Sequence, residues 1–204
     1  MTYTTLTERR LTTARAVAHS AARRIVASLT LTDPERAAAV GAALLRGGVT
    51  TVEVPLAALP GATRVEGLSV AAGNVRSPRD AELALEGGAA FATSPTLDLE
   101  VVRACRTLGL PFLPGVATPN EVQRAVAAGV RAVLVFPAPL LGGAARVAAL
   151  ADAFPDVDFI PAGAIAPEHL RAYPKRATVV SSALVRPADP RVEAAARRAL
   201  RLAA

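Results

Sequence analysis

The sequence predicts a closed (β/α)8 barrel, in which eight parallel strands form a cylinder and helices surround it. The first observation is that short apolar runs alternate with helical stretches along the chain, which is typical of repeated βα units. The second is that these runs are apolar on both faces, as strands are when helices cover a parallel sheet. The expected strands lie at about 25–29, 49–54, 68–72, 89–93, 111–114, 131–136, 157–161 and 177–181.

Glycine and proline mark the ends of the helices between these strands. Glycine follows four helical stretches, where it suits a chain that turns left-handed into the next strand. These stretches are Ala37–Leu45, Arg79–Leu85, Leu99–Leu108 and Glu121–Ala128. Helices are expected to begin where proline precedes a carboxylate, as in the segment Thr118-Pro119-Asn120-Glu121, in which Thr118 is the predicted N-cap.

A single domain accommodates the whole pattern. A chain of 204 residues buries enough surface to fold without disulfides or structural metals. Residues 1–24 are predicted to form an N-terminal helix that packs on the barrel, residues 25–185 the barrel itself, and residues 186–204 a C-terminal helix of the same domain. The second βα unit is expected to be shortened, because Leu56–Gly67 contains Pro60 and Gly61 and leaves little room for a helix.

Composition excludes several classes of protein. The only cysteine, Cys105, excludes an internal disulfide and a multi-cysteine metal site, and it is expected to be buried and inert. Apolar runs are too short for a membrane span, so we expect a cytoplasmic protein without a membrane partner. The formal charge of +6 raises nucleic-acid binding as a hypothesis, but the arginines are scattered and only 3% of residues are aromatic, so that function ranks last.

Glu53 is the only ionisable side chain at the predicted C-terminal strand ends, where barrels of this kind build their active sites. Burial between Val52 and Val54 would favour a general acid or base. The alternative is a structural carboxylate that pairs with an arginine or with backbone amides. The residues alone do not decide between these two roles of Glu53.

Several motifs occur together at the predicted strand ends. The longest is Leu110–Val122, LPFLPGVATPNEV, and the supporting ones are Phe136-Pro137-Ala138, Gly142-Gly143, Phe154-Pro155-Asp156-Val157, Val52-Glu53-Val54 and Thr93-Ser94-Pro95. In this order, over about residues 8 to 185, the chain resembles the 2-keto-3-deoxy-6-phosphogluconate / 4-hydroxy-2-oxoglutarate (KDPG/KHG) aldolase family. The resemblance implies a (β/α)8 barrel, a trimer and lyase chemistry of class I.

The resemblance also implies a lysine two residues before Phe136-Pro137, where it would form a Schiff base with the substrate carbonyl. This chain has Leu134 there, and without an amine no iminium forms. The only lysine, Lys175, precedes the last predicted strand and is therefore expected at the opposite end of the barrel. The arginines that the family places at the ends of strands one and two are Thr30 and Ala57 here.

Other positions that contact substrate in the family also differ. The expected substrate-binding positions in this chain are Asn74, Pro95, Gly163, Ala164, Ser181 and Ser182. In the family, the loops that follow strands seven and eight hold phosphate through backbone N–H groups beside glycine. The side chains of Ala164, Ser181 and Ser182 would crowd that approach, although a serine hydroxyl can also bind phosphate.

Two principal hypotheses follow, and whether the chain is an enzyme stays open between them. In the first, a pseudoenzyme forms a homotrimer or a larger homo-oligomer that binds a ligand or partner, or builds an assembly, without a cofactor. In the alternative, a lyase acts on a small 2-oxo acid through Glu53 and a divalent metal. Neither His19 nor His169 is placed to hold that metal, and no metal site is predicted. The expected ligand is a small 2-oxo acid or a phosphate.

Overall fold

A computed structural model describes residues 25–174, 178–184 and 191–203. The predicted helix over residues 1–24 and the lysine Lys175 lie outside this part. The strands are β1 (Ile25–Ser28), β2 (Thr51–Pro55), β3 (Ser69–Gly73), β4 (Phe91–Thr93), β5 (Phe112–Leu113), β6 (Gly115–Val116), β7 (Ala132–Val135), β8 (Asp158–Gly163) and β9 (Val179–Ser181).

The helices alternate with these strands, as expected. The α-helices are α2 (Pro34–Arg46), α3 (Leu59–Ala62), α4 (Pro78–Glu86), α5 (Leu99–Leu108), α6 (Pro119–Ala127), α7 (Gly143–Ala153) and α8 (Val192–Ala203). The 3-10 helices are η1 (Leu56–Ala58), η2 (Ala138–Leu141) and η3 (Pro167–Ala172).

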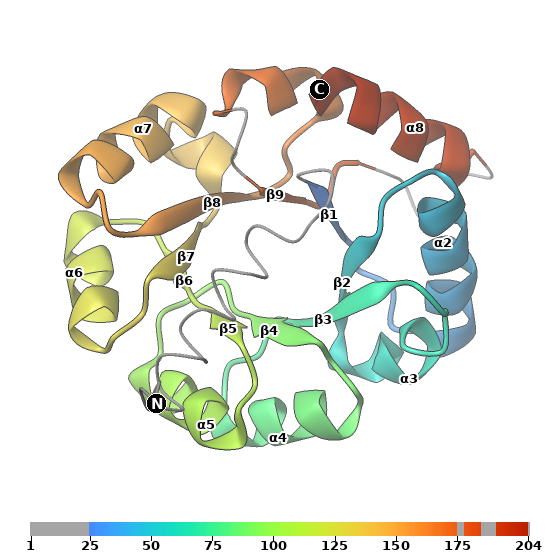
Figure 1. The fold of residues 1–204 in the computed structure, drawn as a ribbon, viewed down its shortest axis with the longest axis horizontal. Coiled ribbons are helices and arrows are strands. Elements are labelled where there is room, and N and C mark those ends of the chain that lie inside the picture. The colour runs from blue at the N-terminus through green and yellow to red at the C-terminus, as the bar shows by residue number, and fades with distance from the viewer. Residues whose placement is uncertain (1–24, 175–177, 185–190, 204) are drawn as a thin grey trace, which may run out of the picture.

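The strands form a ring of parallel neighbours, with the helices on its outside (Figure 1). Their order is β5-β4-β3-β2-β1-β9-β8-β7-β6. The two outer members, β5 and β6, lie end to end and together form the fifth strand of the barrel, separated at Pro114; β5 lies within the predicted range 111–114, and β6 extends beyond its end. Because β5 pairs with β4 and β6 pairs with β7, this strand joins both edges of the sheet. The eight-stranded barrel is confirmed.

Side-chain alternation along the strands divides the core into an inner and an outer part. The inner part is a small cluster that fills the barrel and consists of Val26, Ala71, Phe91, Leu113, Ala132, Leu134, Ile160, Ala162 and Val180. The larger outer cluster lies between the strands and the surrounding helices and includes Val52, Val54 and Val133. β2 contributes no apolar side chain to the inner cluster, because its inward positions are Thr51 and Glu53.

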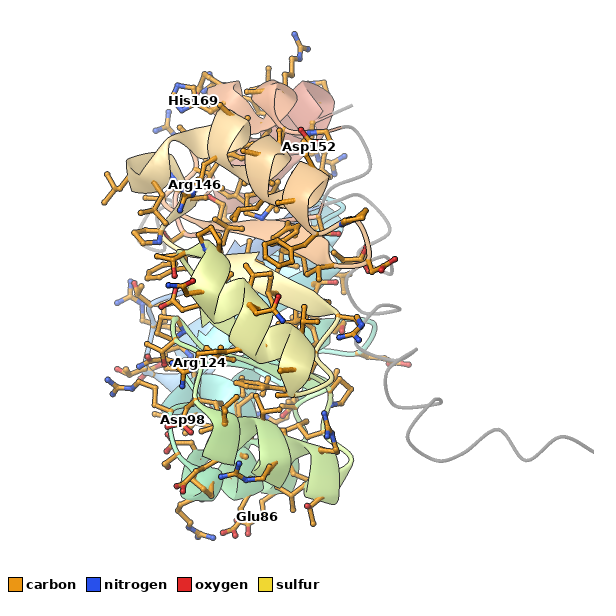
Figure 2. All side chains as sticks on the ribbon, turned by 90° about the vertical axis from the view of Figure 1, so that its left-hand side faces the viewer. Glu86, Asp98, Arg124, Arg146, Asp152 and His169 are labelled. Atoms are coloured by element: carbon orange, nitrogen blue, oxygen red, sulfur yellow. The ribbon has the colours of Figure 1, made fainter. Side chains whose placement is uncertain are left out.

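Side-chain caps fix where the helices begin. Asp33, Ser77, Asp98 and Thr118 accept backbone N–H groups at the starts of α2, α4, α5 and α6. The predicted cap at Thr118 is confirmed, and a capping box with Glu121 completes it. Each helix therefore begins just beyond the C-terminal end of a strand. In the side view, Asp98 at the start of α5 lies on the left of the barrel and Asp152, near the end of α7, lies toward the right (Figure 2).

The second βα unit is shortened, as predicted. It holds only η1 and the four-residue α3, where the other barrel α-helices have nine or more residues. α3 lies so close to α2 that a Cβ atom on Gly61 would stand 1.8 Å from the carbonyl oxygen of Pro34. Helix α8 packs against both α2 and η3. An ion pair from Arg46 to Glu193 at 3.2 Å joins α2 to α8, and one from Arg198 to Glu168 at 2.6 Å joins α8 to η3. The proposed division at residues 24 and 185 stays a prediction.

Among the helices in the described ranges, none combines the length and the apolar character that crossing a membrane requires.

Gly61→Ala tests the contact between α3 and α2. The new methyl group would overlap backbone atoms of Pro34, which cannot move away by a change of side-chain rotamer. We therefore expect the free energy of unfolding to fall by about 3 kcal/mol. Gly41→Ala is the matched control, because its Cβ meets the end of the Leu68 side chain and alanine raises helix propensity; we expect a change within about 1 kcal/mol. Urea unfolding measures both. Equal effects would contradict the close approach of α3.

Candidate functional site

Two adjoining hollows open at the C-terminal ends of the strands. The inner hollow, of about 270 Å³, is lined by Ser28, Thr30, Glu53, Asn74, Thr93, Ser94, Pro95, Leu134, Phe136, Ala162, Gly163, Val180 and Ser182. The outer hollow, of about 520 Å³, is lined by Ser28, Leu29, Thr30, Glu53, Val54, Pro55, Leu56, Ala57, Gly73, Asn74, Arg76 and Asp80. The two share Glu53, Ser28, Thr30 and Asn74 and so form one continuous site.

Glu53 is held between two hydroxyl groups, one from the neighbouring strand β1 and one from β4, two strands away on the other side. Ser28 Oγ, at the end of β1, donates to Glu53 Oε1 at 2.7 Å, and Thr93 Oγ1, at the end of β4, donates to Glu53 Oε2 at 2.6 Å. Glycine at position 73 provides the necessary space, because a Cβ there would stand 2.8 Å from Glu53 Cγ. The carboxylate is thus fixed in one orientation, with further lone pairs on each oxygen able to accept a hydrogen bond from a ligand.

The opposite wall of the inner hollow is apolar. Leu134 lies in β7, is 3% exposed and belongs to the cluster that fills the barrel. Phe136 and Ala162 continue this wall. Gly163 ends β8 with a φ of 131°, a conformation that L side chains rarely adopt. The site therefore has a polar side from β1, β2 and β4 and an apolar side from β7 and β8.

The loop after β3 forms the rim of the site. Asn74 has a φ of 62°, a left-handed conformation that asparagine tolerates better than most residues. Arg76 follows it, and its backbone N–H donates to Asp80 Oδ2 at 2.8 Å. Asp80 also accepts the backbone N–H of Ser77 at 3.0 Å in the capping box of α4. These bonds anchor the loop to the start of the helix.

The structure brings together six of the eight positions singled out in the sequence. They are Glu53, Asn74, Pro95, Leu134, Gly163 and Ser182, all of which line the inner hollow. Two positions do not line either hollow. Ala164 is exposed beyond β8. Ser181 is buried, and its Oγ donates to the carbonyl oxygen of Ile165 at 2.6 Å.

Backbone donors near the predicted phosphate loops are already engaged. The N–H of Ile165 and the N–H of Ser182 both donate to the carbonyl oxygen of Gly163, at 2.9 and 3.1 Å. The N–H of Ala183 donates to Ser181 Oγ at 3.0 Å. Three N–H groups of these loops are therefore directed to acceptors within the chain rather than toward a ligand.

Sequence reasoning assigned no role to three residues of the site: Ser28, Thr93 and Arg76. A signal existed for the first two, because each is a hydroxyl residue at an inward position near the end of an apolar strand; Ser28 is in register with Glu53, and Thr93 lies two residues beyond the register partner of Ala71. For Arg76 there was none, because an exposed arginine after a strand is common on any barrel.

Other reactive groups lie away from the site or are unsuited to it. Burial raises the pKa of Cys105 to about 12, so its thiol is protonated at neutral pH, and its predicted burial is confirmed. Within the described ranges, no group of three or more His, Cys, Asp or Glu side chains could hold a metal ion. A metal at Glu53 would therefore need most of its ligands from substrate or water.

Comparison with known proteins assigns the family. A family model described as KDPG and KHG aldolase matches residues 18–189. The chain belongs to the KDPG and KHG aldolase family. The 2-dehydro-3-deoxy-phosphogluconate aldolase of Treponema pallidum is 34% identical over 157 residues, which are 74% of this chain and 75% of that protein. The resemblance seen in the sequence is confirmed.

Solved structures of this family share the fold. The 4-hydroxy-2-oxoglutarate / 2-dehydro-3-deoxyphosphogluconate aldolase from TTHB1 is 37% identical, with a TM-score of 0.82 over 96% of this chain and 98% of that one. The 2-keto-3-deoxy-6-phosphogluconate aldolase of Zymomonas mobilis ZM4, whose structure contains 3-phosphoglycerate, is 26% identical, with a TM-score of 0.82 over 94% and 95%. The barrel of this chain therefore has the same fold as the barrels of these two aldolases.

Thr93→Val tests the hydrogen bond that holds Glu53. Valine has nearly the same shape but no hydroxyl, so we expect unfolding to become easier by about 1–2 kcal/mol. The same substitution in a Glu53→Ala background should cost much less, since the acceptor is already gone. Thr107→Val, at an exposed position of α5, is the control and should have little effect. Strict additivity of the two site substitutions in urea unfolding would refute the coupling.

Proposed function

We propose that this family member is a pseudoenzyme whose pocket binds a small ligand without forming a Schiff base. The observation that carries the proposal is Leu134. It lies in the wall of the inner hollow, two residues before Phe136-Pro137, where the resemblance implies the catalytic lysine. Among the residues that the structure describes, those that line the two hollows include no lysine.

The chemistry of the pocket supports this proposal. A class I aldolase breaks a carbon–carbon bond after an amine has converted the substrate carbonyl to an iminium, which accepts the electron pair. Leucine has no nitrogen, and the hydroxyls of Ser28 and Thr93 both donate to Glu53. No other lining side chain in the described ranges supplies an amine. Glu53 can orient a ligand through hydrogen bonds without an electron sink beside it.

Retention of the pocket supports binding rather than a purely structural role. The hollows remain open between the strand ends, although several positions of the family's substrate site have changed. The Zymomonas relative was crystallised with 3-phosphoglycerate, a small phosphorylated hydroxy acid. A small acid is therefore the ligand class that the family relation favours.

A metal-dependent lyase is the second candidate. The observation in its favour is Glu53, whose carboxylate lines both hollows and is held in one orientation. In this mechanism Glu53 would remove a proton from a 2-oxo acid while a divalent cation stabilises the enolate. The scarcity of further ligands in the described part of the site places it second.

Other expectations stay predictions. They concern the homotrimer or larger homo-oligomer, the cytoplasmic location, the absence of a cofactor and the low rank of nucleic-acid binding.

A coupled assay of pyruvate release separates the two functions. We expect no release above background from 2-keto-3-deoxy-6-phosphogluconate or 4-hydroxy-2-oxoglutarate, with Mg²⁺, with Mn²⁺ or with EDTA. Release that EDTA abolishes would establish the metal-dependent lyase, and its loss in Glu53→Gln would identify the base. Release that survives EDTA would overturn the pseudoenzyme proposal altogether.

Leu134→Lys tests whether position 134 is the vacant Schiff-base position. An amine there would enter the pocket beside Glu53, so incubation with pyruvate and borohydride should produce a reduced adduct on this residue, detected by mass spectrometry. Leu140→Lys is the matched control, because residue 140 is 84% exposed and lies outside both hollows. At equal pyruvate concentration it should label far more slowly. Equal labelling of two folded variants would contradict the assignment.

A further inference from the structure

Among the described residues that line the two hollows, Arg76 supplies the only positive charge. It follows β3, and β3 is the parallel neighbour of β2, so the loops after these two strands adjoin one another (Figure 1). Ala57, where the family resemblance implies an arginine, lines the same outer hollow. The small side chain of Ala57 leaves room in this hollow for a charged group from the neighbouring loop.

The guanidinium group of Arg76 has no acceptor in the described part of the chain. The ion pairs found there involve other arginines, such as Arg79, which pairs with Glu82 at 2.8 Å. The nearest acid in sequence, Asp80, forms no ion pair with Arg76; its Oδ2 accepts the backbone N–H groups of Arg76 and Ser77. The charge of Arg76 is therefore available to a ligand at the rim.

The distribution of charge orients such a ligand. Glu53 is negative and lies at the inner side, so it repels an anionic group there and favours a hydroxyl that donates to it. Arg76 lies on the outer side and offers paired N–H donors that match a carboxylate. Asp80 lines the same hollow, and its Oδ2 accepts the backbone N–H groups of Arg76 and Ser77. Asn74 lines both hollows and provides an amide between the two ends. The complementary molecule carries a carboxylate at one end and hydroxyl groups at the other.

A second anionic group has no comparable support. At the far side of the inner hollow, the N–H groups of Ile165, Ser182 and Ala183 all donate to acceptors of the chain. No cationic side chain of the described residues lines that hollow. Within the described part of the site, the strongest support for an anion is therefore at Arg76.

On this basis we infer that Arg76 binds the carboxylate of a small hydroxy acid, with the hydroxyl groups of the ligand directed toward Glu53. The inference rests on the proposed binding function of the pocket and names its ligand class. The family resemblance implies an arginine for the substrate carboxylate in the loop after β2, where this chain has Ala57. In this chain the loop after β3 would provide that arginine instead.

Isothermal titration calorimetry with a matched pair of probes tests the inference. D-erythronate is a four-carbon trihydroxy acid, and erythritol has the same carbon skeleton with a CH₂OH group in place of the carboxylate. We expect the full chain to bind erythronate and to bind erythritol at least about tenfold more weakly. Arg76→Gln should weaken erythronate binding by at least about tenfold and leave erythritol unchanged, since only the charge-assisted bonds are lost.

Two further variants keep the outcomes distinct. Arg79→Gln makes the same change of charge outside both hollows and should bind erythronate as the unaltered chain does. Thr30→Trp places a large side chain at an exposed position shared by the two hollows and should abolish binding of both probes. Circular dichroism confirms that each variant is folded.

Three results would overturn the inference. If Arg76→Gln binds erythronate normally while Thr30→Trp does not, the pocket binds acids but Arg76 does not recognise them, and the proposed binding function survives. If the unaltered chain binds erythritol as well as erythronate, the carboxylate is not recognised. If it binds neither probe, the hydroxy-acid inference fails, and the pyruvate-release assay decides separately whether the chain is a pseudoenzyme.

Discussion

Closure of the barrel at Pro114-Gly115 is the constraint on which the site depends. β5 ends before Pro114 and pairs with β4, and β6 begins at Gly115 and pairs with β7. A Cβ on Gly115 would stand 2.3 Å from the carbonyl oxygen of Pro95, so only glycine lets the fifth strand pass so close to the loop after β4. The Pro114 carbonyl then accepts the N–H of Leu134 at 2.9 Å and continues the ladder into β7.

This closure brings two unlike surfaces face to face. Ser28, Glu53 and Thr93 come from one side of the ring, and Leu134 and Ala162 come from the other. In an open sheet of the same strand order, β4 and β7 would be far apart, and the apolar side chains would not limit the access of water to the carboxylate. The hydrogen bonds of Glu53 therefore form in a partly desolvated setting, where electrostatic interactions are stronger than in water.

Much of the fold could be predicted from the sequence, because its signals are local. Apolar runs, glycine after helices and the caps at Ser77 and Thr118 each depend on residues a few positions apart. The division of the fifth strand into β5 and β6 could not be predicted, because it depends on the close contact of Gly115 with Pro95 in the loop after β4, about twenty residues away in the sequence.

Prediction of the site was limited for a similar reason. Glu53 and Leu134 could be singled out because one is polar in an apolar strand and the other stands in a recognisable motif. Ser181 was expected beside them, but its hydroxyl reaches the Ile165 carbonyl instead, a contact that only the fold of the last loops creates. The role inferred for Arg76 depends on the small side chain of Ala57 on the neighbouring loop. Nothing in the sequence spacing of these two residues indicates that they line the same hollow.

The proposed pseudoenzyme keeps a partly buried carboxylate, and the fold must offset the cost of removing that charge from water. Ser28 and Thr93 stabilise the charge, but they would be unnecessary if position 53 held an apolar side chain like Val52 or Val54. Gly73 also lacks a side chain where one would displace Glu53. Strand β2 therefore carries a carboxylate whose burial costs free energy and whose orientation Ser28 and Thr93 fix, while the opposite wall of the hollow presents Leu134. A fixed acceptor for the hydroxyl groups of a ligand accounts for both features, since such an acceptor needs orientation and partial desolvation but no amine.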